Sequence, residues 1–438
     1  MEVFLPKGTR DYLPERMAPR LAVLEIVRNA FSLHGFLPLD TPAFERIETL
    51  EGKYGEEGGK LIFRILERGE GGLAGKADLA LRYDLTVPLA RVIAMNPAIR
   101  FPFRRWQIAP VWRADRPARG RFREFLQCDC DVVGAPQGLA DAECLAVADR
   151  ALVALGFDDV TIRINDRRLL RALAAAVGAA NRESELLVAV DKLDKVGREG
   201  VSGELGRRGF PPEVSETLWS LIDDSLDEGG LDRLAATLSR RVPEHSEQIA
   251  VATAGLKQLI ADATGLGVRA RLVVDSTLAR GLDYYTGPVW ELVAGGGVGT
   301  IAAGGRYDGL IGMFSNRAVA AVGISLGLER ILTILEEAGR MPRATPGPDV
   351  VVCCVEESAR PWALEVVRRA RSAGIATELW VGDGRLKAAM KHADNAGARF
   401  AALVGGAEVE RQEVTLKTLA TGTQQSLSID DTLAAIVL

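Results

Sequence analysis

The sequence predicts an α+β chain of several domains, because its pattern changes along its length. Strand-like runs, rich in β-branched and aromatic residues, lie before residue 166 and return after residue 268. The residues between them carry an almost wholly helical pattern. The Pro/Gly-rich segment MPRATPGP then precedes a stretch in which strand and helix patterns alternate. These changes divide the 438 residues into a first part (1–165 and 269–340), a helical insertion (166–268), a linker (341–347) and a last domain (348–438).

The first part is predicted to begin with a helix over residues 17–35, where apolar side chains recur at helical spacing. The next segment, FLPLDTPAFE, contains prolines that cannot donate to a sheet, so we expect an extended edge strand there. A helix follows over residues 141–157 and a strand over 159–165. After the insertion, strands are predicted at RLVVDS, VWELV, TIAAGG and AVAAVGISLG, and a helix begins at Glu329.

Two longer strands are predicted within residues 100–114 and 122–134. In the second strand, side chains of one face alternate with those of the other. The face that carries the polar residues is formed by Phe125, Gln127, Asp129 and Asp131. A row of polar side chains on one face of a strand is not a core.

The last domain is predicted to be a compact α/β unit with a mostly parallel sheet, because most of its strand patterns are separated by helices. The two long helices are predicted to end at Gly374 and Gly397, where glycine suits a C-terminal cap. The predicted order is DVVVCCV strand, ARPWALEVVRRARSAG helix, IATELWVG strand, RLKAAMKHADNAG helix, ARFAALVGG strand, EVTLKTLA strand and SIDDTLAAIV helix.

Composition sets limits on the class of protein. Hydrophobic residues make up 47% and charged residues 26% of the chain, as in ordinary globular proteins. No window approaches the ~18 apolar residues of a membrane span, and the start has no apolar signal core, so we expect a cytoplasmic protein. Five cysteines in no disulfide or zinc spacing are expected to be reduced. The net charge of -5 argues against wholesale coating of nucleic acid, although it leaves room for a local basic surface.

Such a surface is predicted between Arg100 and Arg123, where the sequence contains eight arginines and a single acid, Asp115. All the bases are arginine and none is lysine, which favours planar, bidentate recognition of phosphate or carboxylate. The alternative is a solvated edge strand whose arginines keep the protein soluble.

Several familiar chemistries are not supported. GVGTIA at residues 297–302 matches a dinucleotide fingerprint, yet a strand pattern follows it where a helix is required. GLAGKA around Lys76 lacks the remaining residues of a phosphate loop. The three histidines stand far from the polar loops, which argues against a serine or cysteine nucleophile with a histidine base. The remaining inventory of Arg, Asp, Glu, Gln and Tyr suits phosphoryl or nucleotidyl chemistry, where catalysis is mostly positioning and charge stabilisation.

Several peptides resemble the motifs of one enzyme class. VWRAD (111–115) followed by RFREF (121–125) resembles motif 2 of class II aminoacyl-tRNA synthetases, and GLERI (327–331) resembles motif 3. The first helix, with the Pro42 strand after it, resembles motif 1. RGLDYYTG and GGRYDGL together resemble the two signature peptides of histidyl-tRNA synthetases. The similarity extends from LPKGTRDYLP at the start to EVTLKTLATGTQ, which lies where the family has its anticodon-binding module.

The resemblance implies an antiparallel catalytic sheet and a site for ATP. Arg113 would contact the α-phosphate and Arg121 the distal phosphates, while Phe125 would stack on adenine. Arg330 would clamp the nucleotide from the other side. Asp115 belongs to the same ATP-binding set, where motif 2 usually has Glu.

The resemblance also implies a site for histidine. Arg280 would neutralise the substrate carboxylate and the pentavalent phosphorus. The amino group would be held by Asp84, Thr86 and Gln127. The imidazole would be faced by Asp131 and Tyr285, with Tyr307 lining the same pocket. Many bacterial members have Glu at the position of Asp131 and Pro-Glu at that of Tyr83 and Asp84, so the shorter acid at 131 would need a water or a shifted strand to reach the imidazole.

By the same resemblance, the histidine carboxylate would attack the α-phosphorus of ATP, with Mg²⁺ neutralising charge, and a terminal hydroxyl of tRNA(His) would then take the acyl group. No protein nucleophile is required. The metal ligands stay unassigned. A homodimer formed through the motif 1 helix and strand is also implied. One alternative stays open: a histidine-sensing regulatory paralog, of the ATP phosphoribosyltransferase regulatory-subunit type, that does not charge tRNA.

Overall fold

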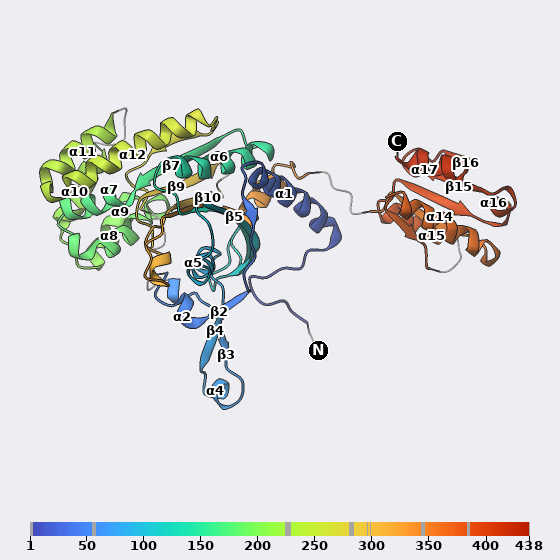
Figure 1. The fold of residues 1–438 in the computed structure, drawn as a ribbon, viewed down its shortest axis with the longest axis horizontal. Helices are drawn as coiled ribbons and strands as arrows, with labels where there is room; N and C mark the ends of the chain where they lie inside the picture. The colour runs from blue at the N-terminus through green and yellow to red at the C-terminus, as the bar shows by residue number, and fades with distance from the viewer. Residues whose placement is uncertain are drawn as a thin grey trace. The chain divides into compact units, whose positions relative to one another are not determined.

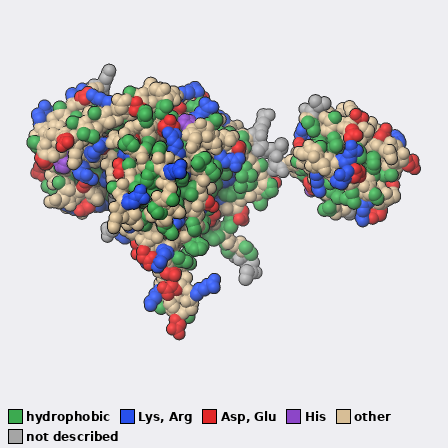
Figure 2. Space-filling model, in the orientation of Figure 1, with side chains coloured by type: hydrophobic (Ala, Val, Ile, Leu, Met, Phe, Trp, Pro, Cys, Tyr) green, Lys and Arg blue, Asp and Glu red, His purple; other side chains and the backbone are tan. Residues whose placement is uncertain are grey.

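The computed structural model describes residues 3–54, 58–223, 229–279, 284–295, 297, 299–342, 347–382 and 386–437. The chain divides into two compact units, Met1–Asp11 with Val23–Met341 and Tyr12–Ala22 with Pro342–Leu438. Lys, Arg, Asp and Glu side chains are mixed over the face of the larger unit that Figure 2 shows. None of the helices in the described part of the chain combines the length and the apolar character that crossing a membrane requires.

The larger unit is built on an eight-stranded sheet with strand order β1-β5-β6-β11-β10-β9-β7-β8. In this order, every neighbouring pair from β5 to β7 is antiparallel, and the parallel pairs are β1–β5 and β7–β8 at the two edges. This confirms the predicted antiparallel sheet. The strands are β1 (Leu37–Pro38), β5 (Phe103–Trp112), β6 (Glu124–Val133), β7 (Val160–Asp166), β8 (Arg271–Val274), β9 (Pro288–Ala294), β10 (Thr300–Arg306) and β11 (Ala321–Gly327). Residues 300–306 form a strand, so the fingerprint-like GVGTIA is not followed by the helix that a dinucleotide site needs.

The two faces of this sheet differ as the alternation of β6 predicts. Cys128, Cys130 and Val132 are buried under helices, in one hydrophobic cluster with side chains of the covering helices. The covering helices are α1 (Pro14–Leu33), whose second half joins this cluster, α6 (Leu139–Ala154) and α13 (Leu328–Glu337). The opposite face carries the polar side chains of β6, so the sheet separates a core from a polar surface. All five cysteines are free thiols, as predicted.

A second, three-stranded sheet in the larger unit was not predicted from the sequence. Its order is β2-β4-β3, and all its pairs are antiparallel. The predicted strand after Gly35 is therefore split: β1 is an edge strand of the large sheet, as expected, and β2 belongs to the small one. The elements here are β2 (Phe44–Arg46), α2 (Ile47–Leu50), β3 (Arg64–Leu66), α4 (Glu70–Leu73), β4 (Ala77–Leu81) and α5 (Thr86–Met95).

The stretch between β7 and β8 is helical, as predicted, and Figure 1 shows its helices gathered at the β7 end of the large sheet. Asp166 begins it, because its side chain accepts a 2.9 Å hydrogen bond from the Arg168 backbone N–H at the start of the first helix. The helices are α7 (Arg167–Ala176), α8 (Glu183–Val190), α9 (Leu193–Arg207), α10 (Pro212–Asp223), α11 (Gly230–Arg241) and α12 (Ser246–Gly265).

The smaller unit contains a five-stranded sheet of order β13-β12-β14-β15-β16. Two of its pairs are parallel and two antiparallel, so the prediction of a mostly parallel sheet was wrong. The reason is that α16 is too short to carry the chain back across the sheet, so β15 and then β16 return as a hairpin. Gly374 and Gly397 have positive φ after their helices, as the predicted caps require. The elements are β12 (Val350–Cys354), α14 (Arg360–Ser372), β13 (Thr377–Leu379), α15 (Leu386–Asn395), β14 (Phe400–Val404), α16 (Gly406–Arg411), β15 (Glu413–Thr418), β16 (Gln424–Ser428) and α17 (Ile429–Val437).

Candidate active site

A cavity of about 730 Å³ lies over the polar face of the large sheet, a volume suited to a substrate-sized ligand. Residues from both sequence parts of the larger unit line it. The predicted site residues among them are Asp84, Thr86, Arg113, Asp115, Arg121, Phe125, Gln127, Tyr285 and Arg330. No histidine or cysteine is among the described residues that line it. The cavity therefore collects cationic, acidic and aromatic groups in one place.

Arg113 stands at the end of β5, with its guanidinium between two aromatic rings. Its central carbon lies 4.3 Å from the ring centroid of Tyr83 and 5.2 Å from that of Phe125. Its Nε donates a 3.0 Å hydrogen bond to the backbone carbonyl of Tyr83. Among the residues that the structure describes, no carboxylate forms an ion pair with Arg113. The side chain is thus held in place while its positive charge stays available to an anion in the cavity.

Two further arginines line the same cavity. Arg121 Nη1 lies 3.4 Å from Asp115 Oδ1, a long and half-exposed pair. Arg330, at the start of α13, donates a hydrogen bond to the backbone carbonyl of Thr300 on β10. The three cationic groups come from the end of β5, the loop before β6 and the start of α13, which is an arrangement suited to an extended polyphosphate.

Asp84 is the acid of the cavity wall, and its position follows from the turn into α5. Its Oδ1 accepts a 3.0 Å hydrogen bond from the Val87 backbone N–H, as a helix cap does. The hydroxyl groups of Tyr54 and Tyr284 donate to its two oxygens, at 3.1 and 3.4 Å. Burial raises the pKa of Asp84, although the hydrogen bonds from Val87 and Tyr54 and the charge of Arg113 oppose the shift. A cationic ligand group at this carboxylate would favour its charged form.

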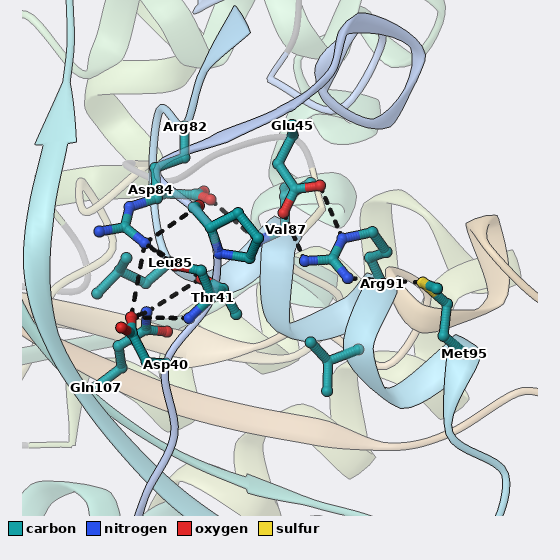
Figure 3. A network of polar contacts seen from close by, with 12 residues as sticks. Asp40, Thr41, Glu45, Arg82, Asp84, Leu85, Val87, Arg91, Met95 and Gln107 are labelled. Atoms are coloured by element: carbon teal, nitrogen blue, oxygen red, sulfur yellow. Dashed lines mark hydrogen bonds and ion pairs between the residues drawn. The ribbon is translucent and has the colours of Figure 1, made fainter. Parts of the chain in front are cut away.

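The turn that carries Asp84 is held by its neighbour Arg82 (Figure 3). The buried Arg82 donates hydrogen bonds of 2.8 Å to the carbonyl of Pro110 on β5 and 2.6 Å to that of Thr41. Burial lowers the pKa of Arg82. On the following helix, Arg91 forms two 2.7 Å contacts with Glu45 of β2. The small sheet and α5 are thus tied to the large sheet beside the cavity.

Gln127 and Tyr285 lie on the cavity floor, and glycines make room for them. Gln127 Nε2 donates a 2.9 Å hydrogen bond to Ser325 Oγ, while its Oε1 has no partner among the described residues. A Cβ on Gly305 would lie 2.9 Å from the ring of Tyr285. A Cβ on Gly304 would lie 2.6 Å from Trp290 Nε1, which also has no described partner. The paired glycines of GGRYDGL therefore allow an aromatic side chain and the floor to approach the backbone closely.

Asp131 and Tyr307 lie beneath this floor and do not line the cavity. The Tyr307 hydroxyl donates to Asp131 Oδ1, and both side chains are buried. Asp131 Oδ2 lies 2.8 Å from Nη2 of Arg105, which is also buried. Burial raises the pKa of Asp131, with Arg105 and Tyr307 opposing the shift. Arg280, the remaining predicted site residue, lies outside the described residues.

Sequence reasoning missed several groups at this site. Tyr54 and Trp290 line the cavity without any motif that marks them, and Tyr83, next to Asp84, lines it without a role assigned from the sequence. Glu329 lines it too, and accepts a 2.5 Å contact from Arg10, whose guanidinium stacks 3.5 Å from the centroid of Phe122. The insertion helices contribute Arg167, Glu185, Asp191, Lys192, Lys195 and Arg208 to the lining. No local pattern could indicate these residues, because their proximity depends on tertiary packing.

The carboxylates of the cavity suit a metal that arrives with phosphate. Among the described residues, no three His, Cys, Asp or Glu side chains form a ready-made metal cluster. Glu291 and Glu329 both line the cavity beside Arg330, and Glu291 accepts a 2.9 Å hydrogen bond from Thr300 Oγ1. Mg²⁺ in nucleotide sites typically uses one or two carboxylates together with substrate phosphates. The donor set therefore fits Mg²⁺ entering with a nucleotide.

The antiparallel sheet, with an arginine-lined cavity on its polar face, has the architecture that the resemblance to class II aminoacyl-tRNA synthetases implies. Comparison with known proteins makes this more specific. The model of the family described as histidyl-tRNA synthetase matches residues 8–331, and that of the anticodon binding domain matches residues 349–437. The chain belongs to the histidyl-tRNA synthetase family.

Individual relatives agree with this family. The histidine–tRNA ligase of Cytophaga hutchinsonii is 39% identical over 99% of this chain and 99% of its own. The crystal structure of histidyl-tRNA synthetase from Nostoc sp. PCC 7120 has a TM-score of 0.80 and 32% identity, covering 100% of this chain and 99% of that one. A structure from Bacillus halodurans C, titled as an ATP phosphoribosyltransferase regulatory subunit/histidyl-tRNA synthetase, has a TM-score of 0.72 at 21% identity, covering 93% of this chain and 99% of that one, and shares the fold.

Proposed function

We propose that the chain activates L-histidine with ATP and transfers it to the 3′ end of tRNA(His). The observation that carries this proposal is the guanidinium of Arg113, which is fixed between aromatic rings and unpaired with acid among the described residues, in a cavity that also contains the buried Asp84. A zwitterionic amino acid and a polyanionic nucleotide require both kinds of group within reach of each other.

The ATP-binding roles follow from these surroundings and from the family. Arg113 holds the α-phosphate, and Arg121 and Arg330 hold the phosphates beyond it. Phe125 stacks on the adenine ring. Asp115 orients Arg121, which it contacts at 3.4 Å. Glu291 and Glu329 are the residues that would hold Mg²⁺, which would supply positive charge at the phosphates.

Histidine occupies the neighbouring part of the cavity. Asp84, Thr86 and Gln127 hold its amino group, and Arg280 holds its carboxylate. The imidazole lies against Tyr285, with Asp131 and Tyr307 beneath. A carboxylate oxygen then attacks the α-phosphorus, and the bond to the β-phosphate oxygen breaks, so that pyrophosphate leaves with its electron pair. In the second step a terminal hydroxyl of tRNA attacks the carbonyl carbon, loses its proton, and releases AMP.

The partners follow from the rest of the chain. Residues 348–438 are proposed to bind the anticodon of tRNA(His), and residues 166–268 form a helical insertion that lines part of the active site. A homodimer through the first helix and strand is supported by exposed apolar side chains in this region. They are Leu33, Leu37 and Phe44.

The function and the domain division can be tested in one experiment. The intact chain is expected to exchange labelled pyrophosphate into ATP with histidine and not with glutamine or other amino acids. Deleting residues 347–438 is expected to spare this exchange, because the cavity is lined by residues of the larger unit, and to weaken charging of tRNA.

Histidine binding without exchange by the intact chain would instead favour the regulatory alternative. Loss of both exchange and charging in a deletion variant that remains folded, judged by circular dichroism, would contradict the proposed division of labour.

A further inference from the structure

A buried cluster of one cation and two acids lies on the polar face of the sheet, next to the imidazole end of the proposed site. Arg105 on β5 stands opposite Asp131 on β6 in the strand register, and Asp129 lies two residues away on the same face. All three are buried, with 0%, 2% and 2% of their surfaces exposed. Arg105 Nη2 also donates a 3.0 Å hydrogen bond to the carbonyl of Leu85, which anchors the guanidinium to the turn that carries Asp84.

The two acids of this cluster are held differently. Asp131 Oδ1 accepts a hydrogen bond from the Tyr307 hydroxyl, and Asp131 Oδ2 lies 2.8 Å from Arg105 Nη2 as an ion pair, without a hydrogen bond among the described residues. Asp129 has an Oδ1 with no partner among the described residues, and two donors of Arg105, Nε and Nη1, are also without described partners. Burial, together with the neighbouring Asp131, raises the pKa of Asp129 to about 7, whereas Arg105 opposes this shift. One arginine therefore balances two carboxylates, and the cluster carries one net negative charge when all are ionised.

The cluster is coupled to the cavity through glycines of β10 and β11. Gly323 of β11 pairs with Asp131 on one side and with Gly305 of β10 on the other. The ring of Tyr285 packs on Gly305, and a Cβ on Gly323 would lie 1.9 Å from Asp131 Oδ1. Ser325, which lines the cavity, stands opposite Asp129 in the register. Only small side chains thus separate the charge of the cluster from a ligand beside Tyr285. The low dielectric of this buried region strengthens the electrostatic interaction between them.

We propose that Arg105 is a positioning residue for recognition of the imidazole. It offsets the charge of Asp129, so that Asp131 stays ionised and oriented beneath the floor, and the cluster carries at most one net negative charge toward the ligand's N–H group. This inference rests on the proposed function, and it adds residues 105 and 129 to the determinants of histidine specificity. It also gives a reason for arginine at 105. A planar guanidinium contacts a carboxylate and a carbonyl at once, and its charge persists when it is buried.

The test uses the full chain and three variants: Asp129→Asn, Arg105→Met and the double variant. Each single change alters the net charge of the cluster by one, in opposite directions, and the double change restores it. Each single variant is expected to raise KM for histidine at least about tenfold in pyrophosphate exchange, with KM for ATP within about twofold. In the double variant, KM for histidine is expected to return to within about threefold of its value in the unaltered chain. Additive structural damage from two substitutions would not produce this recovery. Arg104→Met is the matched control, because Arg104 is the preceding residue on β5 and is partly exposed beside Glu143.

A histidine KM that is unchanged in Asp129→Asn, or a double variant as impaired as the worse single variant, would overturn the inference. Equal increases in KM for histidine and for ATP would also overturn it. If Arg105→Met does not fold, KM for histidine in the nearly isosteric Asp129→Asn variant is the deciding measurement. A double variant that folds where Arg105→Met does not would support the charge balance between Arg105 and Asp129. An unaltered chain without histidine-dependent exchange would remove the proposed function and this inference with it; normal exchange with unaffected variants would remove only the inference.

Discussion

Replacing Arg113 by alanine is expected to slow histidine-dependent pyrophosphate exchange by about 10²- to 10³-fold at saturating substrates, equivalent to about 2.7–4 kcal/mol of transition-state stabilisation. The reason is that negative charge at the α-phosphorus increases as the carboxylate attacks, and Arg113 is already held in place to meet it. Its guanidinium lies near the rings of Tyr83 and Phe125, and its Nε donates a 3.0 Å hydrogen bond to a backbone carbonyl. Such a preorganised group needs no rearrangement during the reaction.

The effect should fall on kcat more than on KM for ATP, because Arg121 and Arg330 remain to hold the nucleotide. Arg100→Ala is the control, since this exposed arginine belongs to the same arginine-rich segment and does not line the cavity. Thermal unfolding should be similar in both variants. Exchange within a few-fold of normal in folded Arg113→Ala would contradict the role given to Arg113.

The second large effect is expected on stability. Replacing Arg306 by methionine should lower the free energy of unfolding by about 3–5 kcal/mol, because it leaves Asp141 as an uncompensated buried charge. Both side chains are 1% exposed, and two hydrogen bonds of 3.0 and 2.7 Å join them. Arg306 also donates to the carbonyls of Ala135 and Pro136, both at 3.1 Å. The measurement is chemical denaturation of the larger unit, followed by tryptophan fluorescence.

Two comparisons make this prediction specific. Adding Asp141→Asn to Arg306→Met should recover part of the loss, because the uncompensated charge is then gone. Arg64→Met should have little effect, because Arg64 and Glu51 are 59% and 48% exposed and their charges stay in water. A loss below about 1 kcal/mol in Arg306→Met would mean that water or another group replaces the arginine.

The arginines also illustrate how far the sequence predicts the site. Strand periodicity places Gln127 and Asp131 on one polar face, and the resemblance to class II motifs assigns Arg113 and Arg330 to one nucleotide site, where a single cavity does contain both. Pattern alone cannot distinguish the arginines between residues 100 and 123. Arg105 is buried because β5 pairs with β6 in the register that sets it opposite Asp131. Register is a property of the folded sheet and not of one strand.

Other omissions have similar causes. The small sheet was not predicted because its strands are short and lie among glycines and charged residues, where propensity is weak. Helix α5 was not predicted because Pro88 interrupts its pattern, yet proline is tolerated in a first turn. Arg10 and Glu329 contact each other across 319 positions, and nothing local indicates such a pair. The mixed sheet of the smaller unit depends on a hairpin after β14 that alternating patterns do not distinguish from a crossover.

The central claim is that this chain attaches histidine to tRNA. The most direct measurement is incubation of the intact protein with ATP, Mg²⁺, total tRNA and each labelled amino acid in turn, followed by recovery of label in acid-precipitable tRNA. We expect label from histidine alone, released by mild base as an ester would be and absent without ATP. Charging with a different amino acid, or no charging by a folded protein that binds histidine, would contradict it.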